Sequence, residues 1–212
     1  MRFLLGLLCI SVVGLSGCMS AVETHVDAYS SIPADIEPKT VYISPYNKAD
    51  ANSLKWKENA GILASVLSER GFQTVAQRRD ATLIAYFGFA VDNGERVQST
   101  YSIPQWGVTG YSGAQTYGTV YGNSVSATTT YTPTYGVTGY QTGTTTETIF
   151  TRSVSIDMLD RSSGKKVFEA QAVSSGACNS FTPIARQIIG AVMSEFPSGK
   201  SGKISLPFDG EC

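Results

Sequence analysis

Between positions 97 and 146 this chain of 212 residues carries no charged side chain, and Arg96 and Glu147 bracket the uncharged run. Thr, Gly, Tyr and Ser make up most of the segment, which also holds seven of the chain's eleven tyrosines. Because such a composition offers little aliphatic surface to bury, the segment cannot order itself around a core of its own. The sequence therefore predicts a domain built from the flanking residues, with residues 97–146 as a long insert.

The insert admits three interpretations. In the first, the insert is a partly disordered or flexibly hairpinned connection between two strands, since long loops in compact domains are usually functional or disordered. In the second it is a contact surface, and in the third it is a membrane-inserted hairpin of the kind found in curli-secretion-type pore lipoproteins. The stretch "TYGTVYG" alternates as a membrane strand does, but most alternate positions hold Thr, Ser or Gly, where a lipid face requires larger apolar residues.

The contact-surface interpretation is compatible with the first one. Tyrosines on a Gly/Ser background supply a large amphipathic area at low side-chain entropy cost. A short repeat, "GVTGY", also occurs twice, at 107–111 and 136–140. The partner would be a periplasmic protein, a glycan or a second copy of the chain. The candidate contact residues are Trp106, Tyr111, Tyr117, Tyr121, Tyr131, Tyr135 and Tyr140.

Helical periodicity occurs on both sides of the insert. Before it, apolar residues recur three and four apart at Trp56, Ala60, Leu63 and Leu67. Asn52 or Ser53 can cap the start of this helix, and Gly71 suits the left-handed position just past its end. After the insert, Thr182 as cap and Pro183 at the first position predict a second helix that Pro197 stops.

Strand patterns occupy the remaining flanks. Residues 40–44 form a short candidate, and residues 82–91 are apolar on both alternations, as in a central strand. The pair Asn93-Gly94 predicts a two-residue hairpin turn, and "RSSGK" separates two alternating runs that predict a second hairpin. We expect an α+β fold, in which an antiparallel sheet carries two helices on one face as a two-layer sandwich.

Three stretches read "ILASVLSERGFQTVAQRRDATLIAYF", "SVSIDMLDRSSGKKVFEAQA" and "IARQIIGAVMSEFPSG". They resemble the bacterial lipoproteins grouped as domain of unknown function 4136, in which a helix ending in L-x-x-[KR]-G-[FY] precedes a D-[AL]-x-[ILV]-x-[YF] strand and a closing helix ends at Phe-Pro. Phe168 stands where that family usually has Trp. The resemblance covers about residues 62–91 and 153–199, and it implies the fold and the lipoprotein setting but no catalytic residues.

The first eighteen residues, "MRFLLGLLCISVVGLSGC", predict a secreted and lipid-anchored protein. The apolar run after Arg2 is too short to span a bilayer and suits a signal peptide. Leu15 to Cys18 resembles the bacterial lipobox, which implies cleavage before Cys18 and acylation of that residue. By resemblance to the enterobacterial sorting rule, Met19 in place of Asp at the next position favours the outer over the inner membrane. We expect a signal peptide at 1–17, a lipid-anchored tether at 18–38, the α+β domain at 39–199 and a tail at 200–212.

The cysteines agree with an oxidising compartment. Cys9 leaves with the signal peptide and Cys18 takes the lipid, so Cys178 and Cys212 remain as an even pair and a disulfide candidate. No metal site is expected, because the only histidine, His25, falls in the tether and two distant cysteines do not make a zinc cage.

Few residues offer chemistry. Removing Arg2 leaves 15 basic against 17 acidic side chains, which gives no nucleic-acid footprint. The chain has no phosphate-binding glycine motif and no histidine placed to activate a nucleophile. Asp157 and Glu169 could face one another across a hairpin as a glycosidase-type pair, although a charged solvent face is the simpler interpretation. Asp80 and Asp160 are turn residues by context.

These observations favour a non-enzymatic outer-membrane lipoprotein, a binding or scaffold module on the periplasmic side of the envelope with the insert as its interaction element. No cofactor is expected apart from the covalent lipid on Cys18, and no nucleic-acid partner. The alternatives are an envelope glycan hydrolase that uses carboxylates and a pore or secretion-associated subunit.

Overall fold

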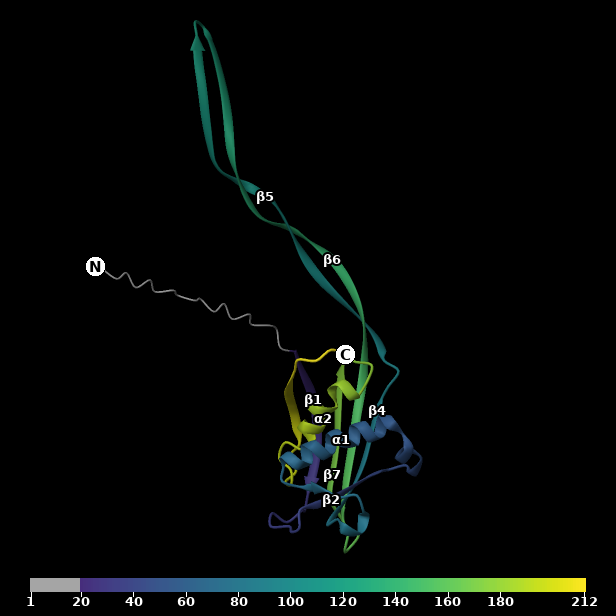
Figure 1. Ribbon diagram of the computed structural model, residues 1–212. Coiled ribbons are helices and arrows are strands. Elements are labelled where there is room, and N and C mark those ends of the chain that lie inside the picture. Colours follow the sequence, from purple (N-terminus) through teal and green to yellow (C-terminus); the bar gives the residue numbers. More distant parts are fainter. Residues whose placement is uncertain (1–19) are drawn as a thin grey trace, which may run out of the picture. The chain divides into compact units, whose positions relative to one another are not determined.

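The computed structural model describes residues 20–212, which fold as two compact units, residues 20–94 with 150–212 and residues 95–149. The strands are β1 (Ser20–Ser30), β2 (Thr40–Pro45), β3 (Gln73–Thr74), β4 (Leu83–Val91), β5 (Glu95–Tyr121), β6 (Ser124–Asp160), β7 (Lys166–Gly176) and β8 (Gly202–Phe208). The helices are α1 (Leu54–Glu69) and α2 (Ala185–Val192), with short 3-10 turns at η1 (Lys48–Asn52), η2 (Arg78–Asp80) and η3 (Thr182–Ile184) (Figure 1).

The larger unit is α+β and contains a mixed sheet in the order β3-β2-β4-β6-β7-β1-β8. The prediction of a purely antiparallel sheet is wrong at one edge, because β2 runs parallel to both β3 and β4. The reason is the connection: α1 lies between β2 and the two strands that follow it in the chain. A helical crossover of that kind returns the chain to the starting end of the sheet and so favours parallel pairing.

One alternation of each central strand is buried in a core shared with both helices. Ala85 and Phe87 of β4, Ile156 of β6 and Phe168 of β7 are 1% exposed or less. From α1 and α2 come Leu63, Leu67, Ile188 and Ile189, each 0% exposed. The apolar side chains that the sequence spaces by two on strands and by three or four on helices therefore meet in one core.

The predicted first helix is confirmed. Ser53 caps α1 by accepting a hydrogen bond from the Trp56 backbone nitrogen at 3.2 Å. Gly71 follows its end with φ +82°, the left-handed conformation that glycine adopts without steric cost. The Trp56 indole nitrogen donates to the Phe87 carbonyl at 3.0 Å and so ties the helix to β4.

The second helix is shorter than the sequence predicts. Its α-helical part ends at Val192, before the expected stop at Pro197, and Thr182 does not cap it. Thr182 instead accepts a hydrogen bond from Asn59 of α1 at 3.1 Å, since it lies in the 3-10 turn η3. The turns after α2 bring the buried Phe196 ring against Phe72 and Phe168, with centroids 4.8 and 5.3 Å apart. Packing of that ring thus takes precedence over continuing the helix.

The expected tether at 18–38 and tail at 200–212 both contribute strands. β1 pairs with β7 on one side and with β8 on the other, so both chain ends join the sheet. Val22, Val26 and Ala28 of β1 point into the core, whereas Glu23 and His25 are exposed. The sequence "SAVETHVDAYS" does show this alternation of period two, but the charged residues between the valines give the segment the composition of a linker.

The Asn93-Gly94 pair turns the chain without making a hairpin, which corrects the prediction. β4 and β5 do not pair with each other, because both pair with β6 at successive stretches of that long strand. The Asp92 carboxylate accepts hydrogen bonds from the backbone nitrogens of Gly94 and Thr151, both at 2.9 Å, and the first of these bonds lowers the freedom of the turn. The turn therefore leads the chain from β4 into β5, which pairs with a different stretch of β6.

The smaller unit is a two-stranded antiparallel hairpin that contains the whole insert 97–146. β5 and β6 pair from Glu95↔Ile149 to Tyr121↔Ser124, so the insert forms two paired strands that are interrupted by three register shifts (Figure 1). Gly122 and Asn123 connect the strands, and Gly122 has φ +60°. A glycine with positive φ at the first turn position suits a two-residue hairpin connection. The Gly-Asn pair was thus the sequence signal for this hairpin.

Candidate functional site

The hairpin of β5 and β6 has two chemically different faces. Side chains alternate between faces along a strand, and directly paired residues share a face. The register then assigns one set, here called the aromatic face, as Pro104, Trp106, Val108, Tyr111, Tyr131, Pro133, Tyr135, Val137 and Tyr140. The opposite set at the same level, called the glycine face, is Gln105, Gly107, Thr109, Gly110, Gly113, Thr132, Thr134, Gly136, Thr138 and Gly139.

Five of the seven predicted contact residues share the aromatic face. Trp106, Tyr111, Tyr135 and Tyr140 are between 66% and 72% exposed, so their rings are open to solvent. Tyr131 lies beside Tyr111, with ring centroids 5.5 Å apart. Tyr117 and Tyr121 are the exceptions, because the register near the turn places them on the other face of the ribbon. The sequence identified these residues, but only the register divides them between two surfaces.

The two copies of GVTGY lie opposite each other. Their first residues, Gly107 and Gly136, form a direct cross-strand pair, and Val108 and Val137 follow them on their respective strands. Since the strands are antiparallel, the repeat is arranged about a local twofold axis through the Gly107–Gly136 pair. Trp106 and Tyr135 occupy equivalent places before the glycines, and Tyr111 and Tyr140 occupy equivalent places at the repeat ends.

The threonines of the repeat obey the same symmetry. Thr109 and Thr138 fall at register shifts, where one strand has an extra residue. The Thr109 hydroxyl donates to the Thr134 carbonyl at 3.3 Å, and the Thr138 hydroxyl donates to the Gln105 carbonyl at 3.2 Å. The repeat is therefore a structural unit in which each half makes the same contacts.

The glycines of the repeat are needed for close packing. A Cβ atom at Gly107 would lie 3.0 Å from Cγ2 of Thr138, and one at Gly136 would lie 3.1 Å from Cγ2 of Thr109. Each bulge threonine thus covers the glycine of the other strand. At the level of the repeat, the ribbon therefore has bulky rings on one side and closely packed Gly and Thr residues on the other.

The carboxylate pair of the larger unit is brought together. Asp157 and Glu169 are direct cross-strand partners in β6 and β7. Lys166 lies between them, with its Nζ 3.0 Å from Asp157 Oδ2 and 3.4 Å from Glu169 Oε1. The side chains of Glu169 and Lys166 are 49% and 42% exposed. A shared cation on an open sheet face is the arrangement of a solvated charge cluster.

A shallow depression adjoins this cluster, with a volume of about 390 Å³. It is lined by Tyr46, Gly88, Phe89, Ala90, Ser153, Ser155, Asp157, Glu169 and Gln171. Burial raises the pKa of the Tyr46 hydroxyl above its ordinary value, and the negative charge of Asp157 raises it further. Tyr46 is therefore a neutral hydrogen-bonding group in this depression.

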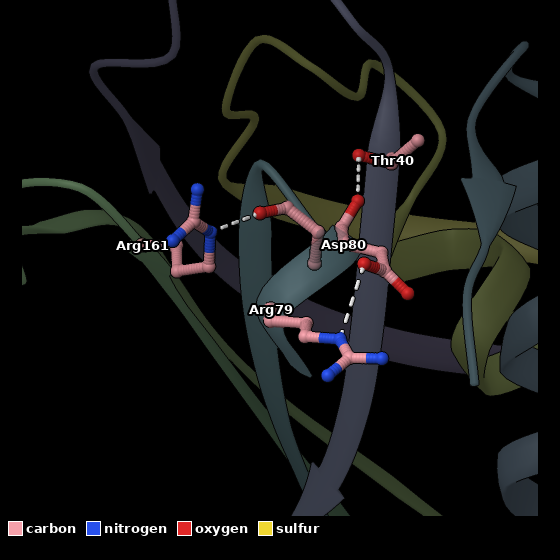
Figure 2. Close-up of polar contacts among 5 residues, drawn as sticks. Thr40, Arg79, Asp80 and Arg161 are labelled. Carbon is pink, nitrogen blue, oxygen red and sulfur yellow. Dashed lines mark hydrogen bonds and ion pairs between the residues drawn. The ribbon is translucent and has the colours of Figure 1, made fainter. Parts of the chain in front are cut away.

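The other two acidic residues singled out by the sequence lie at the ends of elements, Asp80 as the last residue of η2 and Asp160 as the last residue of β6. Figure 2 shows Asp80, whose backbone carbonyl accepts from the Thr40 hydroxyl at 3.2 Å and whose carboxylate lies 3.7 Å from Nε of Arg79. Arg161 donates from Nε to the Ala81 carbonyl at 2.6 Å. Asp160 accepts from the hydroxyls of Ser162 and Ser163 at 2.6 and 2.7 Å. These contacts hold loops in place.

Arg152 is a buried charged residue that the sequence patterns did not single out. It is 3% exposed and donates to the Ser174 carbonyl, the Ser174 hydroxyl and the Cys178 carbonyl at 3.3 to 3.5 Å. Burial lowers the pKa of its guanidinium, and the charge of Asp92 partly offsets that effect. The sequence signal for its burial was its position, because Arg152 continues the core-facing alternation of Val154 and Ile156.

Arg152 also connects the sheet to the disulfide region. A disulfide joins Cys178 to Cys212, whose Cα atoms are 5.0 Å apart. Cys18, the predicted lipid acceptor, lies outside the described residues. Within residues 20–212, no group of three or more His, Cys, Asp or Glu side chains is placed to hold a metal ion. In the same part of the chain, no helix is long and apolar enough to cross a membrane.

The sheet, helices and inserted hairpin define an α+β protein with a two-stranded extension. Residues 27–198 match the family described as "Domain of unknown function (DUF4136)", and the chain belongs to that family. This confirms the resemblance drawn from the helix and strand blocks. No curated protein matches the chain.

The solved structures that are similar to this one include the following two. A PDZ domain protein from Parabacteroides distasonis has a TM-score of 0.44 and 10% sequence identity; the similarity covers 87% of this chain and 39% of that one. The PelC dodecamer from Paraburkholderia phytofirmans has a TM-score of 0.42 and 16% identity, covering 84% of this chain and 99% of that one. This chain thus spans well under half the length of the first structure.

Proposed function

We propose that this chain is a non-enzymatic binding or scaffold protein of the bacterial cell envelope, with the hairpin of β5 and β6 as its interaction element. The observation that carries the proposal is the aromatic face. Trp106, Tyr135 and Tyr140 are each at least 70% exposed on one side of an uncharged ribbon. Exposed aromatic residues gathered on one surface mark an interaction site, because burying them against a partner removes a large apolar area from water.

The placement in the envelope rests on the sequence. The lipobox-like "LSGC" motif supports acylation of Cys18, and Met19 supports sorting to the outer membrane. Two or more acyl chains give stable membrane anchoring. We expect the full chain to sediment with membranes and a Cys18→Ser variant to be released, with the difference in acyl mass measured by intact mass spectrometry.

A two-layer arrangement of the larger unit is part of the same proposal. Its support is that both helices share one core with a single alternation of the strands, whereas Asp157 and Glu169 lie on the other alternation. That polar side of the sheet would stay uncovered in the envelope, with Lys166 neutralising part of its charge. The carboxylates then serve solubility, and no step of catalysis is assigned to them.

The interaction role is tested by comparing the two faces. A Trp106→Ala/Tyr135→Ala variant removes two rings of the aromatic face, and Tyr117→Ala removes an equally exposed ring from the other face. We expect the first variant to lose most of the partners recovered with the full chain from envelope extracts, and the second to keep them. Deletion of residues 98–145 should reproduce the loss. Unchanged recovery in the deletion would contradict the proposal.

A further inference from the structure

We infer that the aromatic face is a homotypic interface, through which the hairpin packs against the same face of a second copy of this chain. The inference rests on the proposed function, since it names the partner of the proposed interaction element. The patch concerned consists of Trp106, Val108, Tyr111, Tyr135, Val137 and Tyr140, the large residues contributed by the two GVTGY repeats and the positions before them.

The first argument is that the ribbon lacks a second layer. A two-stranded hairpin on its own is marginally stable in water, and it needs a hydrophobic face that packs against something. In the part of the chain that the structure describes, the large residues of this face remain open: Trp106 is 71% exposed, Tyr135 70% and Val108 45%. Two ribbons stacked through their aromatic faces would supply the missing layer to each other.

Symmetry favours a second copy over another partner. The patch is related to itself by the local twofold axis at the Gly107–Gly136 pair, and that axis is perpendicular to the ribbon. A directional ligand, such as a glycan strand or an extended peptide, would meet nearly the same groups in either orientation, since only the Trp106 and Tyr135 positions differ between the two halves. In an isologous dimer each subunit presents the same patch, so every contact that one subunit makes is made again by the other.

The absence of charge on the patch also favours a second copy as the partner. No residue between positions 97 and 146 is charged, although the rest of the chain carries all its Lys, Arg, Asp and Glu residues. Two copies of the patch therefore meet without like-charge repulsion and without burying an unpaired ion, the two penalties that usually prevent identical surfaces from pairing. A strongly charged partner finds no complementary group on this surface.

The glycine face explains why one side alone is used. At the level of the repeat, Thr109 and Thr138 cover Gly136 and Gly107, and the side chains of this face between positions 105 and 113 and between 132 and 139 are Gln, Gly and Thr alone. The repeat thus places its bulky residues on one face and its packing residues on the other. The Gly and Thr residues stabilise the ribbon, and the Trp, Tyr and Val residues are left for the dimer contact.

The first test measures oligomeric state with one charge added to either face. The full lipidated chain in detergent is compared with Val137→Asp, on the aromatic face, and Thr132→Asp, on the glycine face, by analytical ultracentrifugation. We expect a dimer for the wild type and for Thr132→Asp. Val137→Asp should dimerise about tenfold more weakly or not at all, because each dimer would bury two carboxylates without partners. A monomeric wild type, or equal effects of the two substitutions, would overturn the inference.

A second test identifies the partner directly in intact cells. A benzophenone amino acid replaces either Tyr135 or Tyr117, which are 70% and 71% exposed but lie on different faces. Irradiation should give, from position 135 alone, an adduct of twice the chain mass that yields peptides of this chain only. An adduct between position 135 and another protein or a glycan would overturn the homotypic interface and leave the proposed function standing. No adduct from either position would contradict both.

Discussion

The Asp160 carboxylate accepts hydrogen bonds from the hydroxyls of Ser162 and Ser163 and from the Ser163 backbone nitrogen in the turn between β6 and β7. The Ser162 hydroxyl has the largest effect and, with the others, lowers the pKa of Asp160 from 3.8 to about 2. A lowered pKa means that the folded state binds fewer protons than the unfolded state. The resulting stability is present above pH 3.8 and is lost as the pH falls through about 2.

We therefore predict that Asp160→Asn flattens the acid limb of the stability curve over this window. The free energy of unfolding, measured in denaturant, should fall less steeply in the variant than in the wild type as the pH is lowered. The difference in slope corresponds to the uptake of up to one proton on unfolding. A Ser162→Ala/Ser163→Ala variant should flatten the same limb, because it removes hydroxyl donors while keeping the carboxylate. An unchanged slope in both variants would show that these hydrogen bonds do not form in solution.

The Gly107–Thr138 contact predicts that the cost of a substitution at position 107 depends on the side chain at position 138. Gly107→Ala brings a Cβ to within 3.0 Å of the Thr138 methyl group, and we expect a loss of about 1 kcal/mol in the local stability of the hairpin. Adding Thr138→Ala should restore most of it. Gly139→Ala is the control, since nothing lies within 4 Å of the added Cβ. Amide hydrogen exchange in the hairpin measures each effect, and equal losses in all three variants would contradict the contact.

At the scale of single elements, substitutions in β1 test whether this segment is a strand of the sheet or a tether. Val26 is 2% exposed between β7 and β8, and the neighbouring His25 is exposed on the opposite face. We predict that Val26→Asp prevents folding, because burying an unpaired carboxylate costs several kcal/mol, out of the about 5–15 kcal/mol that stabilise a domain. His25→Asp should melt close to the wild type. Thermal unfolding followed by circular dichroism would refute the strand if both variants melted alike.

The elements also show which patterns sequence reasoning handles well. α1 was predictable because its stripe, its Ser53 cap and Gly71 are local signals that tertiary packing did not oppose. β1 was missed because charged residues stand between its alternating apolar residues, and its pairing with β7 and β8 was not visible in the sequence. α2 ends early because the Phe196 ring packs between Phe72 and Phe168, a contact between residues far apart in the chain.

For the whole molecule, the Cys178–Cys212 disulfide fixes the chain end to the sheet. The two cysteines are 34 positions apart, and closing such a loop stabilises by about 3–4 kcal/mol in the chain-entropy view. We predict that Cys178→Ser/Cys212→Ser lowers the free energy of unfolding by about that amount. Added reductant should lower the stability of the wild type and leave the double variant unchanged. If reductant affected neither protein, the bond would not be formed in solution.

The candidate site was only partly predictable. The sequence pointed to the uncharged segment, its tyrosines and its repeat, because composition and repetition are local properties. It could not assign Tyr135 and Tyr117 to different faces of the hairpin, since a shift of one residue in register moves a side chain to the other face. It could not place the repeat on a twofold axis either, because that depends on which residues pair across the turn at Gly122.

The sequence by itself determined the two helices, the central strands, the family and the uncharged insert, since each is encoded by spacing or composition within a short window. The tertiary structure decided the parallel edge of the sheet, the inclusion of both chain ends and the separation of an aromatic face from a glycine face. The physical reason is that pairing partners lie far apart in the chain: β1 meets β7 and β8, and Gly107 meets Gly136, only after the backbone hydrogen bonds of distant strands have formed.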